Sequence, residues 1–243
     1  MLRKKISDRN VCVMKPEKLF LKRVHLFQSL SDEDIERLAA SLRYRHLKKG
    51  ETLFRKGDEG NSLYIVRSGS IRIVLPSETG EEVSPAILSE GTFFGEMALL
   101  DGMPRSADAV ALEASEVFAL NRRDFLSFLL NNENAIQSIF SFLSMRLRKT
   151  DDLLEDVCFF NISTRLARRL VELAASYGRQ KEGEDIIQID LRLTQKDLAS
   201  MVGVTRESIN KEMKVLRERN LISTRENMIQ ILNLTRLKRR ARL

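Results

Sequence analysis

The sequence predicts an α+β fold in three parts: an antiparallel β-barrel, a long amphipathic helix and a C-terminal winged helix-turn-helix. Short Val/Ile/Leu-containing runs between Arg45 and Leu120, punctuated by glycines, indicate the barrel. An apolar repeat with alternating intervals of four and three indicates the long helix, and two capped helices meeting at Gly203 indicate the third part. A chain of 243 residues can hold one large domain or two modest ones, each with its own core.

The N-terminal part divides into an arm and a helical region. Residues 1–16 are basic and poorly patterned, and a flexible arm is expected there. Residues 17–42 are interpreted as helix, with Ser31 offering a helix-start cap. This helical region and the barrel are expected to form a first domain over residues 17–130.

The run Phe94–Leu100, followed closely by Pro104–Ala107, is the most informative segment. The guanidinium of Arg105 suits the single negative charge of a cyclic phosphodiester better than an ammonium group would. A glycine lets the backbone approach such a ligand, and a short helix over residues 96–100 would point its first N–H groups at the same anion. The residues expected to bind the phosphate are Gly95, Met97, Ala98, Arg105 and Ser106.

Glu96 is expected to bind the sugar of the same ligand. A 3′,5′-cyclic phosphate leaves the ribose 2′-hydroxyl free, and a carboxylate is an acceptor for that hydroxyl. The loop therefore predicts a cyclic nucleotide site. The alternative is a surface turn in which Glu96 and Arg105 form an ion pair.

The apolar repeat lies within residues 131–160, which are interpreted as a dimerisation helix. A lone helix with such a stripe needs a partner, which favours a homodimer; the alternative is that the stripe packs on its own barrel. Thr150 is the polar member of this seam, and polar seam residues weaken packing in return for register or function. The seam consists of Ile136, Phe140, Leu143, Leu147, Thr150, Leu154 and Val157.

Residues 161–243 contain the helix-turn-helix pattern. Thr194 begins a T-x-x-D capping pattern, Gly203 permits a tight turn, and Thr205 is placed to cap the second helix. The alternation from Leu221 to Ile231 predicts a β-hairpin, which makes the module a winged helix. The residues expected to form its buried face are Val202, Val204, Ile209, Met213 and Leu216.

The outward side chains at the start of the second helix are suited to reading bases in the major groove of DNA. An arginine can bind guanine O6/N7, and a glutamate can accept from cytosine N4. These candidate readers are Arg206, Glu207, Asn210 and Lys211.

The charge distribution agrees with a nucleic-acid-binding module at the C-terminus. Residues 163–243 contain 18 Lys and Arg against 10 Asp and Glu, so a net charge of +8 lies there and about −1 in the rest of the chain. A basic third joined to a near-neutral remainder is the electrostatic pattern of a DNA-binding module on a sensor.

Several function classes are disfavoured. No apolar stretch approaches the length of a bilayer span and the N-terminus lacks a signal-peptide segment, so a cytoplasmic protein without a membrane partner is expected. Cys12 and Cys158 lie far apart and His25 and His46 stand alone, so no metal site is expected. No P-loop, dinucleotide, G-x-S-x-G or metalloprotease motif occurs, and no enzymatic activity is expected.

These motifs resemble those of the CRP/FNR family of bacterial transcription regulators. The segment from Phe94 to Ala107 is similar to the family's phosphate-binding cassette, and the resemblance covers nearly the whole chain beyond residue 16. It implies a jelly-roll cyclic-nucleotide-binding barrel with cyclic AMP as effector, and double-stranded DNA with a palindromic operator and RNA polymerase as partners of the homodimer. Further similar segments are Lys49–Glu51, Gly57–Asp58, Tyr64–Val66 and Ser68–Ser70.

The resemblance also implies roles for single residues. Thr150 matches a threonine that contacts the adenine amino group, whereas Asp151 replaces a serine that reaches the nucleotide of the opposite subunit. Because a carboxylate can accept from the same amino group, adenine recognition can survive the change, but the choice between cyclic AMP and cyclic GMP stays open. Asp151 also keeps open a regulator that needs no effector or senses another small molecule.

In the DNA-binding part, Thr205–Ser208 resembles the start of the family's recognition helix. Lys211 stands in place of a third base-reading arginine, and it lacks the bidentate fork, so looser readout is expected there. Thr194 and Gln195 match positions that contact the DNA backbone. A cyclic-nucleotide-gated enzyme is the less favoured reading, because the winged helix already occupies the chain after residue 160.

Overall fold

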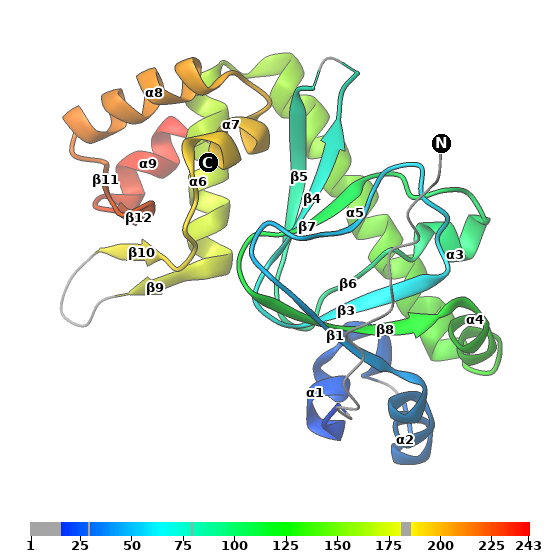
Figure 1. Cartoon of the computed structure of the whole chain (residues 1–243). Coiled ribbons are helices and arrows are strands. Elements are labelled where there is room, and N and C mark those ends of the chain that lie inside the picture. Colours follow the sequence, from blue (N-terminus) through cyan, green and yellow to red (C-terminus); the bar gives the residue numbers. More distant parts are fainter. Residues whose placement is uncertain (1–15, 29, 79, 181–185) are drawn as a thin grey trace. The chain divides into compact units, whose positions relative to one another are not determined.

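The computed structural model describes residues 16–28, 30–78, 80–180 and 186–243, and the predicted α+β fold is confirmed (Figure 1). The expected N-terminal arm lies almost entirely outside these residues. The chain divides into two compact units. The first combines the chain up to Pro76 with Ala86–Leu147, and the second combines Ser77–Pro85 with Arg148–Leu243.

The N-terminal region is helical as predicted, with the expected helix start at Ser31, but it is divided into three short pieces. It contains α1 (Lys18–Arg23), a 3-10 turn (His25–Phe27) and α2 (Asp32–Ser41). Val24 leaves the helical region of backbone space with ψ of 119°, and the Ser31 side chain accepts from Asp34 N–H to start α2 anew. The breaks let each short helix bury its own apolar residues.

Two four-stranded antiparallel sheets form the body of the first unit, although the strand over residues 82–88 belongs to the second unit up to Pro85. One has the order β1-β8-β3-β6 and the other β2-β7-β4-β5, and they share a core in which Leu47 and Val66 of the first sheet meet Ile71 of the second. The strands are β1 (Arg43–Leu47), β2 (Thr52–Phe54), β3 (Ser62–Ser68), β4 (Ile71–Pro76), β5 (Glu82–Leu88), β6 (Phe93–Phe94), β7 (Asp108–Ala111) and β8 (Ser115–Asn121).

Strand β3 is buried on both faces, with the period of two expected for a pleated strand. Tyr64 and Val66 face the core between the sheets, whereas Leu63 and Ile65 contribute to a second core beneath the N-terminal helices. The helices α3 (Met97–Asp101), α4 (Arg122–Leu130) and α5 (Glu133–Phe159) follow the strands in between.

Helix α5 uses one face for its own barrel. Ala135, Ile139 and Phe142 are buried in the second core, whereas Phe140 and Leu147 of the predicted seam are 65% and 63% exposed. The alternative that the seam packs on its own barrel holds only in part, because Leu143 is partly buried against this core whereas Phe140 and Leu147 are exposed. Among the described residues, no helix is long and apolar enough to span a membrane.

The second unit holds the predicted winged helix. Helix α6 (Ile162–Tyr177) precedes α7 (Gln195–Val202) and α8 (Arg206–Glu218), and α9 (Leu234–Arg240) follows the hairpin. The hairpin is β11 (Ile222–Arg225) and β12 (Met228–Ile231), and its turn residues Glu226 and Asn227 both have positive φ, as a type I′ turn requires. Strands β9 (Gly178–Gln180) and β10 (Ile187–Ile189) complete the sheet β11-β12-β10-β9.

Candidate functional site

Arg105 lies buried in the first unit, held by backbone carbonyls. Its Nη1 donates to the Gly95 carbonyl at 2.7 Å and its Nη2 to the Ser62 carbonyl at 2.6 Å. Its own backbone pairs with Gly57 and Asp58, since Gly57 N–H donates to the Arg105 carbonyl and Arg105 N–H to the Asp58 carbonyl, each at 2.8 Å. Backbone and side chain are thus both fixed, and the guanidinium has a defined orientation.

Aromatic rings cover the same guanidinium. Its Cζ lies 4.2 Å from the Phe54 ring centroid and 5.6 Å from that of Tyr64. Burial lowers the pKa of Arg105, while Tyr64, Glu96 and Asp58 act in the opposite direction, and an arginine remains charged throughout. Within the described part of the chain, its Nε has no hydrogen-bond partner.

The backbone at position 95 requires a glycine. Its φ is +81°, a conformation that side chains rarely adopt, and a Cβ there would lie 2.5 Å from Nη1 of Arg105. The loop and the arginine therefore fit together only when this residue has no side chain.

Glu96 is fully buried, at 0% exposure. Its Oε1 pairs with Arg146 of α5, and its Oε2 has no partner among the described residues. Desolvation raises the pKa of Glu96, whereas Arg146 and Arg105 lower it. The alternative of a surface turn is wrong, because Glu96 and Arg105 are both buried.

The other predicted phosphate contacts surround this pair. Helix α3 begins at Met97, one residue later than expected, and Glu96 caps it, with its carbonyl accepting from Leu99 and Leu100 N–H. Ala98 is buried and Met97 is partly exposed. Ser106 is exposed, and its hydroxyl lies 3.7 Å from the sulfur of Met97. The structure thus brings together six of the eight predicted nucleotide-binding residues.

The remaining two, Thr150 and Asp151, are exposed on α5. They lie beyond Arg148, where the second unit begins. Their part in nucleotide recognition therefore stays a prediction.

The helix-turn-helix forms through the predicted local bonds. Thr194 and Asp197 make a reciprocal capping box, in which Asp197 N–H donates to the Thr194 hydroxyl at 3.2 Å and Thr194 N–H to the Asp197 carboxylate at 2.9 Å. Gly203 ends α7 in the left-handed conformation at φ +69°, and Thr205 caps α8 by accepting from Ser208 N–H. These caps fix where the second helix starts.

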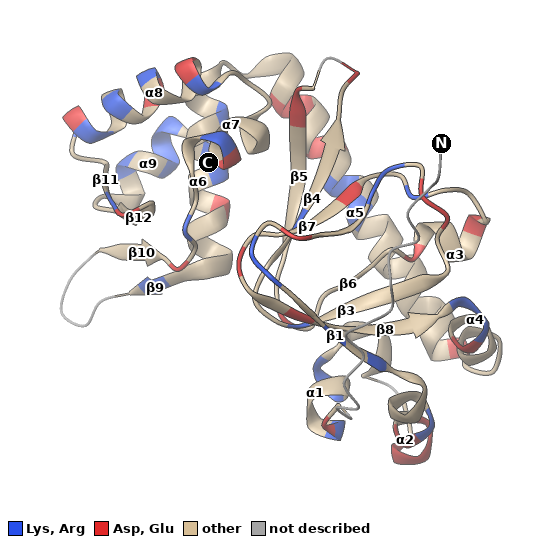
Figure 2. Ribbon diagram, viewed as in Figure 1, with Lys and Arg blue, Asp and Glu red and all other residues tan. Residues whose placement is uncertain are grey.

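Helix α8 presents the predicted base readers to solvent. Ile209, Met213 and Leu216 form its buried face, while Val204, predicted to be buried, is only half-buried. Hydrogen bonds from its own N–H and from Thr205 lower the pKa of Glu207, which keeps this residue an acceptor. The exposed residues are Arg206, Glu207, Asn210 and Lys211. Lys and Arg positions recur along both α8 and α9, with acidic positions among them on α8 (Figure 2).

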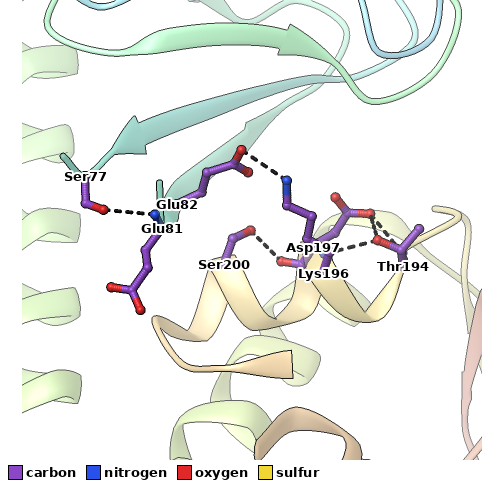
Figure 3. A network of polar contacts seen from close by, with 7 residues as sticks. All are labelled: Ser77, Glu81, Glu82, Thr194, Lys196, Asp197 and Ser200. Atoms are coloured by element: carbon purple, nitrogen blue, oxygen red, sulfur yellow. Dashed lines mark hydrogen bonds and ion pairs between the residues drawn. The ribbon is translucent and has the colours of Figure 1, made fainter. Parts of the chain in front are cut away.

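The N-terminus of α7 carries a small polar network (Figure 3). Lys196 Nζ lies 3.1 Å from Glu82 of β5, and the Ser200 hydroxyl donates to the Asp197 carbonyl at 2.8 Å. Gln195, the predicted backbone contact next to Lys196, borders a cavity of about 270 Å³ between α7, α8 and the wing. Within the described residues, no cluster of three or more His, Cys, Asp or Glu could hold a metal ion.

Two family models match separate parts of the chain. A cyclic nucleotide-binding domain matches residues 44–132, and a Crp-like helix-turn-helix domain matches residues 164–240. The Cyclic AMP receptor protein of Thermus thermophilus is 31% identical over 206 residues, which cover 85% of this chain and 91% of the relative. The chain belongs to the CRP/FNR family.

A further relative and two solved structures cover between 82% and 91% of the chain. A CRP-like cAMP-activated global transcriptional regulator of Mycobacterium tuberculosis is 29% identical over 222 residues, 91% of this chain and 98% of the relative. A solved CRP/FNR-family regulator, also from Thermus thermophilus, gives a TM-score of 0.69 at 25% identity, over 82% of this chain and 98% of that chain. A global regulator of Xanthomonas campestris shares the fold, with a TM-score of 0.72 at 24% identity over 84% of this chain and 100% of that chain.

As a CRP/FNR member, the chain is a ligand-binding, DNA-binding transcription regulator, and the family consists of such regulators rather than enzymes. The cyclic nucleotide-binding domain makes a cyclic nucleotide the class of effector that its residues fit. The unpartnered Glu96 oxygen and Arg105 nitrogen of the described chain are consistent with that class.

Two site residues were missed by the sequence analysis of this CRP/FNR protein. Arg146 pairs with Glu96 across fifty positions of sequence, and Phe54 covers Arg105 from another strand. Arg146 could have been found, since it continues a second stripe of Ala135, Ile139 and Phe142, one position before each seam residue. For Phe54, the sequence carries no comparable signal.

Proposed function

We propose that this regulator is controlled by cyclic AMP and binds a palindromic operator as a homodimer. The observation that carries the proposal is the pair of buried polar atoms without partners in the described chain, Oε2 of Glu96 and Nε of Arg105. An unsatisfied buried polar group costs about 1–3 kcal/mol, and more when it is charged. A ribose 2′-hydroxyl would satisfy the first atom and a cyclic phosphate the second.

The curated relatives support cyclic AMP in particular. The Mycobacterium tuberculosis relative is described as cAMP-activated, and the Thermus thermophilus relative as a cyclic AMP receptor protein. Thr150 and Asp151 are proposed to complete the site by contacting the adenine amino group, as the family resemblance implies.

The homodimer is proposed from the two faces of α5. One face is buried against the barrel, and Phe140, Leu147, Leu154 and Val157 remain largely exposed on the seam. A second copy would bury this stripe. Its symmetry would place two recognition helices roughly 34 Å apart, one turn of DNA.

In the proposed complex, the base readers are Arg206, Glu207, Asn210 and Lys211, with looser readout at Lys211. Thr194, Gln195 and Thr205 contact the DNA backbone. The exposure of α8's readers and the cap at Thr205 support this assignment. RNA polymerase is proposed as the protein partner at the promoter. The ligand increases DNA binding because it binds more tightly to the dimer arrangement in which the two recognition helices fit the operator.

Isothermal titration with cyclic AMP and cyclic GMP tests the effector. We expect saturable binding with preference for cyclic AMP, and loss of binding in Arg105→Leu, because an apolar side chain cannot pair with the phosphate. Arg123→Leu is the matched control, since Arg123 is exposed on α4. It should bind like the wild type.

Binding of neither nucleotide by the folded wild type would overturn the proposal. It would favour the second candidate, a regulator of the same architecture with another small-molecule effector or none. Asp151 is the residue that favours this candidate, and the Xanthomonas campestris regulator of the same fold is described as c-di-GMP responsive.

A further inference from the structure

The guanidinium of Arg105 is oriented by three neighbours from different strands. Ser62 begins β3 and Gly95 follows β6, and their carbonyls each take one terminal nitrogen. Phe54 ends β2 in the opposite sheet, and its ring lies over the guanidinium face. The carbonyls hold one edge of the group, but two hydrogen bonds alone leave it able to swing about the line joining them.

The Phe54 ring is itself held in place. It belongs to a group of three rings, with centroids 5.8 Å from Tyr64 and 6.0 Å from Phe94, while Tyr64 and Phe94 stack at 5.6 Å. Offset ring pairs of this kind are stable arrangements. The ring therefore offers a fixed flat surface against which the guanidinium rests.

Nε–H is the guanidinium donor with no partner among the described residues, although Nε is buried. Nη1 and Nη2 each donate to a carbonyl and keep a second N–H beside the one given to it. With the plane of the group fixed, the direction of the Nε–H bond is fixed as well.

We propose that Phe54 is a positioning residue for Arg105, which holds the guanidinium plane so that Nε–H is aimed at the phosphate of the cyclic nucleotide. This inference rests on the proposed function. It assigns to Phe54 a role that an aliphatic side chain such as leucine would not fill, because leucine has no ring face for a cation.

Substitution at Phe54 separates positioning from packing. We expect Phe54→Leu to weaken cyclic AMP binding by about 2- to 30-fold, the range of a cation–ring contact, and Phe54→Tyr to bind within about twofold of the wild type. Phe125→Leu is the control, since Phe125 is fully buried in the other core of the first unit. It should lose stability and keep its affinity.

A second measurement needs no ligand. In NMR spectra of the full chain, the side-chain protons of Arg105, assigned with Arg105→Lys, should carry the upfield shift that a ring face produces. This shift should fall markedly in Phe54→Leu, where only the more distant Tyr64 ring remains, and persist in Phe54→Tyr and Phe125→Leu.

The inference is overturned if Phe54→Leu binds cyclic AMP as the wild type does, or if the Arg105 signals do not move in that variant. Failure of the proposed function looks different. The wild type would then bind neither cyclic nucleotide, and the Arg105 signals alone would decide whether Phe54 positions the guanidinium.

Discussion

Gly95 illustrates how closely single atoms are matched in the nucleotide site. Its backbone has a φ of +81°, and Nη1 of Arg105 lies 2.5 Å from the position of a Cβ, too close for ordinary contact. A side chain at this position has two separate costs, the strained backbone and the displaced guanidinium.

We expect Gly95→Ala to lose about 1–2 kcal/mol of unfolding free energy from backbone strain and to lose cyclic AMP binding as well. Gly50→Ala is a matched control, since Gly50 has a similar φ of +78° but open space around it. It should be destabilised to a similar extent and bind normally. Denaturant unfolding and isothermal titration measure the two effects, and equal affinities in both variants would contradict the expectation.

The residues of the nucleotide site could be predicted from the sequence only where they lie close together along the chain. Gly95, Glu96 and Arg105 lie within one short run, whose chemistry indicates a phosphate and a sugar. Arg146 and Phe54 come from segments distant in the sequence, and only the fold brings them to that run. The partner of Glu96 thus depends on which face α5 turns to the barrel.

At the scale of elements, the helix-turn-helix depends on its caps. The four N–H groups at the start of a helix lack partners within it, and the hydroxyl of Thr205 satisfies one of them, that of Ser208. The residue at which α8 starts determines which side chains lie in its first turn, where the candidate base readers begin.

Removing this cap should destabilise the second unit. We expect Thr205→Ala to lower the free energy of unfolding by about 1 kcal/mol, and Thr205→Ser, which keeps the hydroxyl, to stay within a few tenths of the wild type. Thermal unfolding measures both. Equal stability of the two variants would mean that the hydroxyl does not cap the helix in solution.

Elements defined by local chemistry were predicted best. The capping box, the turn at Gly203 and the polar hairpin turn all form as expected. The region 17–42 was predicted as helix with a helix start at Ser31, and that start is confirmed, whereas the break at Val24 was not predicted. Helix α9 was not predicted. It is short and rich in Lys and Arg, and only Leu237 and the C-cap residue Ala241 mark its buried side, so the sequence shows no clear apolar period.

At the scale of the whole molecule, helix α5 carries two apolar stripes with different surroundings. One stripe is already covered by the barrel of the same chain, and the seam beside it is largely exposed. The proposed assembly depends on the second stripe alone.

A charge within the seam should therefore prevent assembly without unfolding the chain. We expect Leu147→Lys to sediment as a monomer at concentrations where the wild type is a dimer, because a lysine cannot be buried in the seam without large cost. Leu130→Lys is the control, since Leu130 is 80% exposed at the end of α4, outside the seam. A dimeric Leu147→Lys protein would contradict the proposed interface.

The ion pair between Glu96 and Arg146 also constrains how such a chain can change over generations. Losing Arg146 leaves the fully buried carboxylate of Glu96 without its ion-pair partner, at a cost of about 3–5 kcal/mol, whereas the Arg146 side chain is itself 40% exposed. Arg105 is different, because backbone carbonyls hold it and are present whatever the side chains are. A lineage adapting to a new effector would thus tend to replace positions 96 and 146 together, and these two positions should vary as a pair.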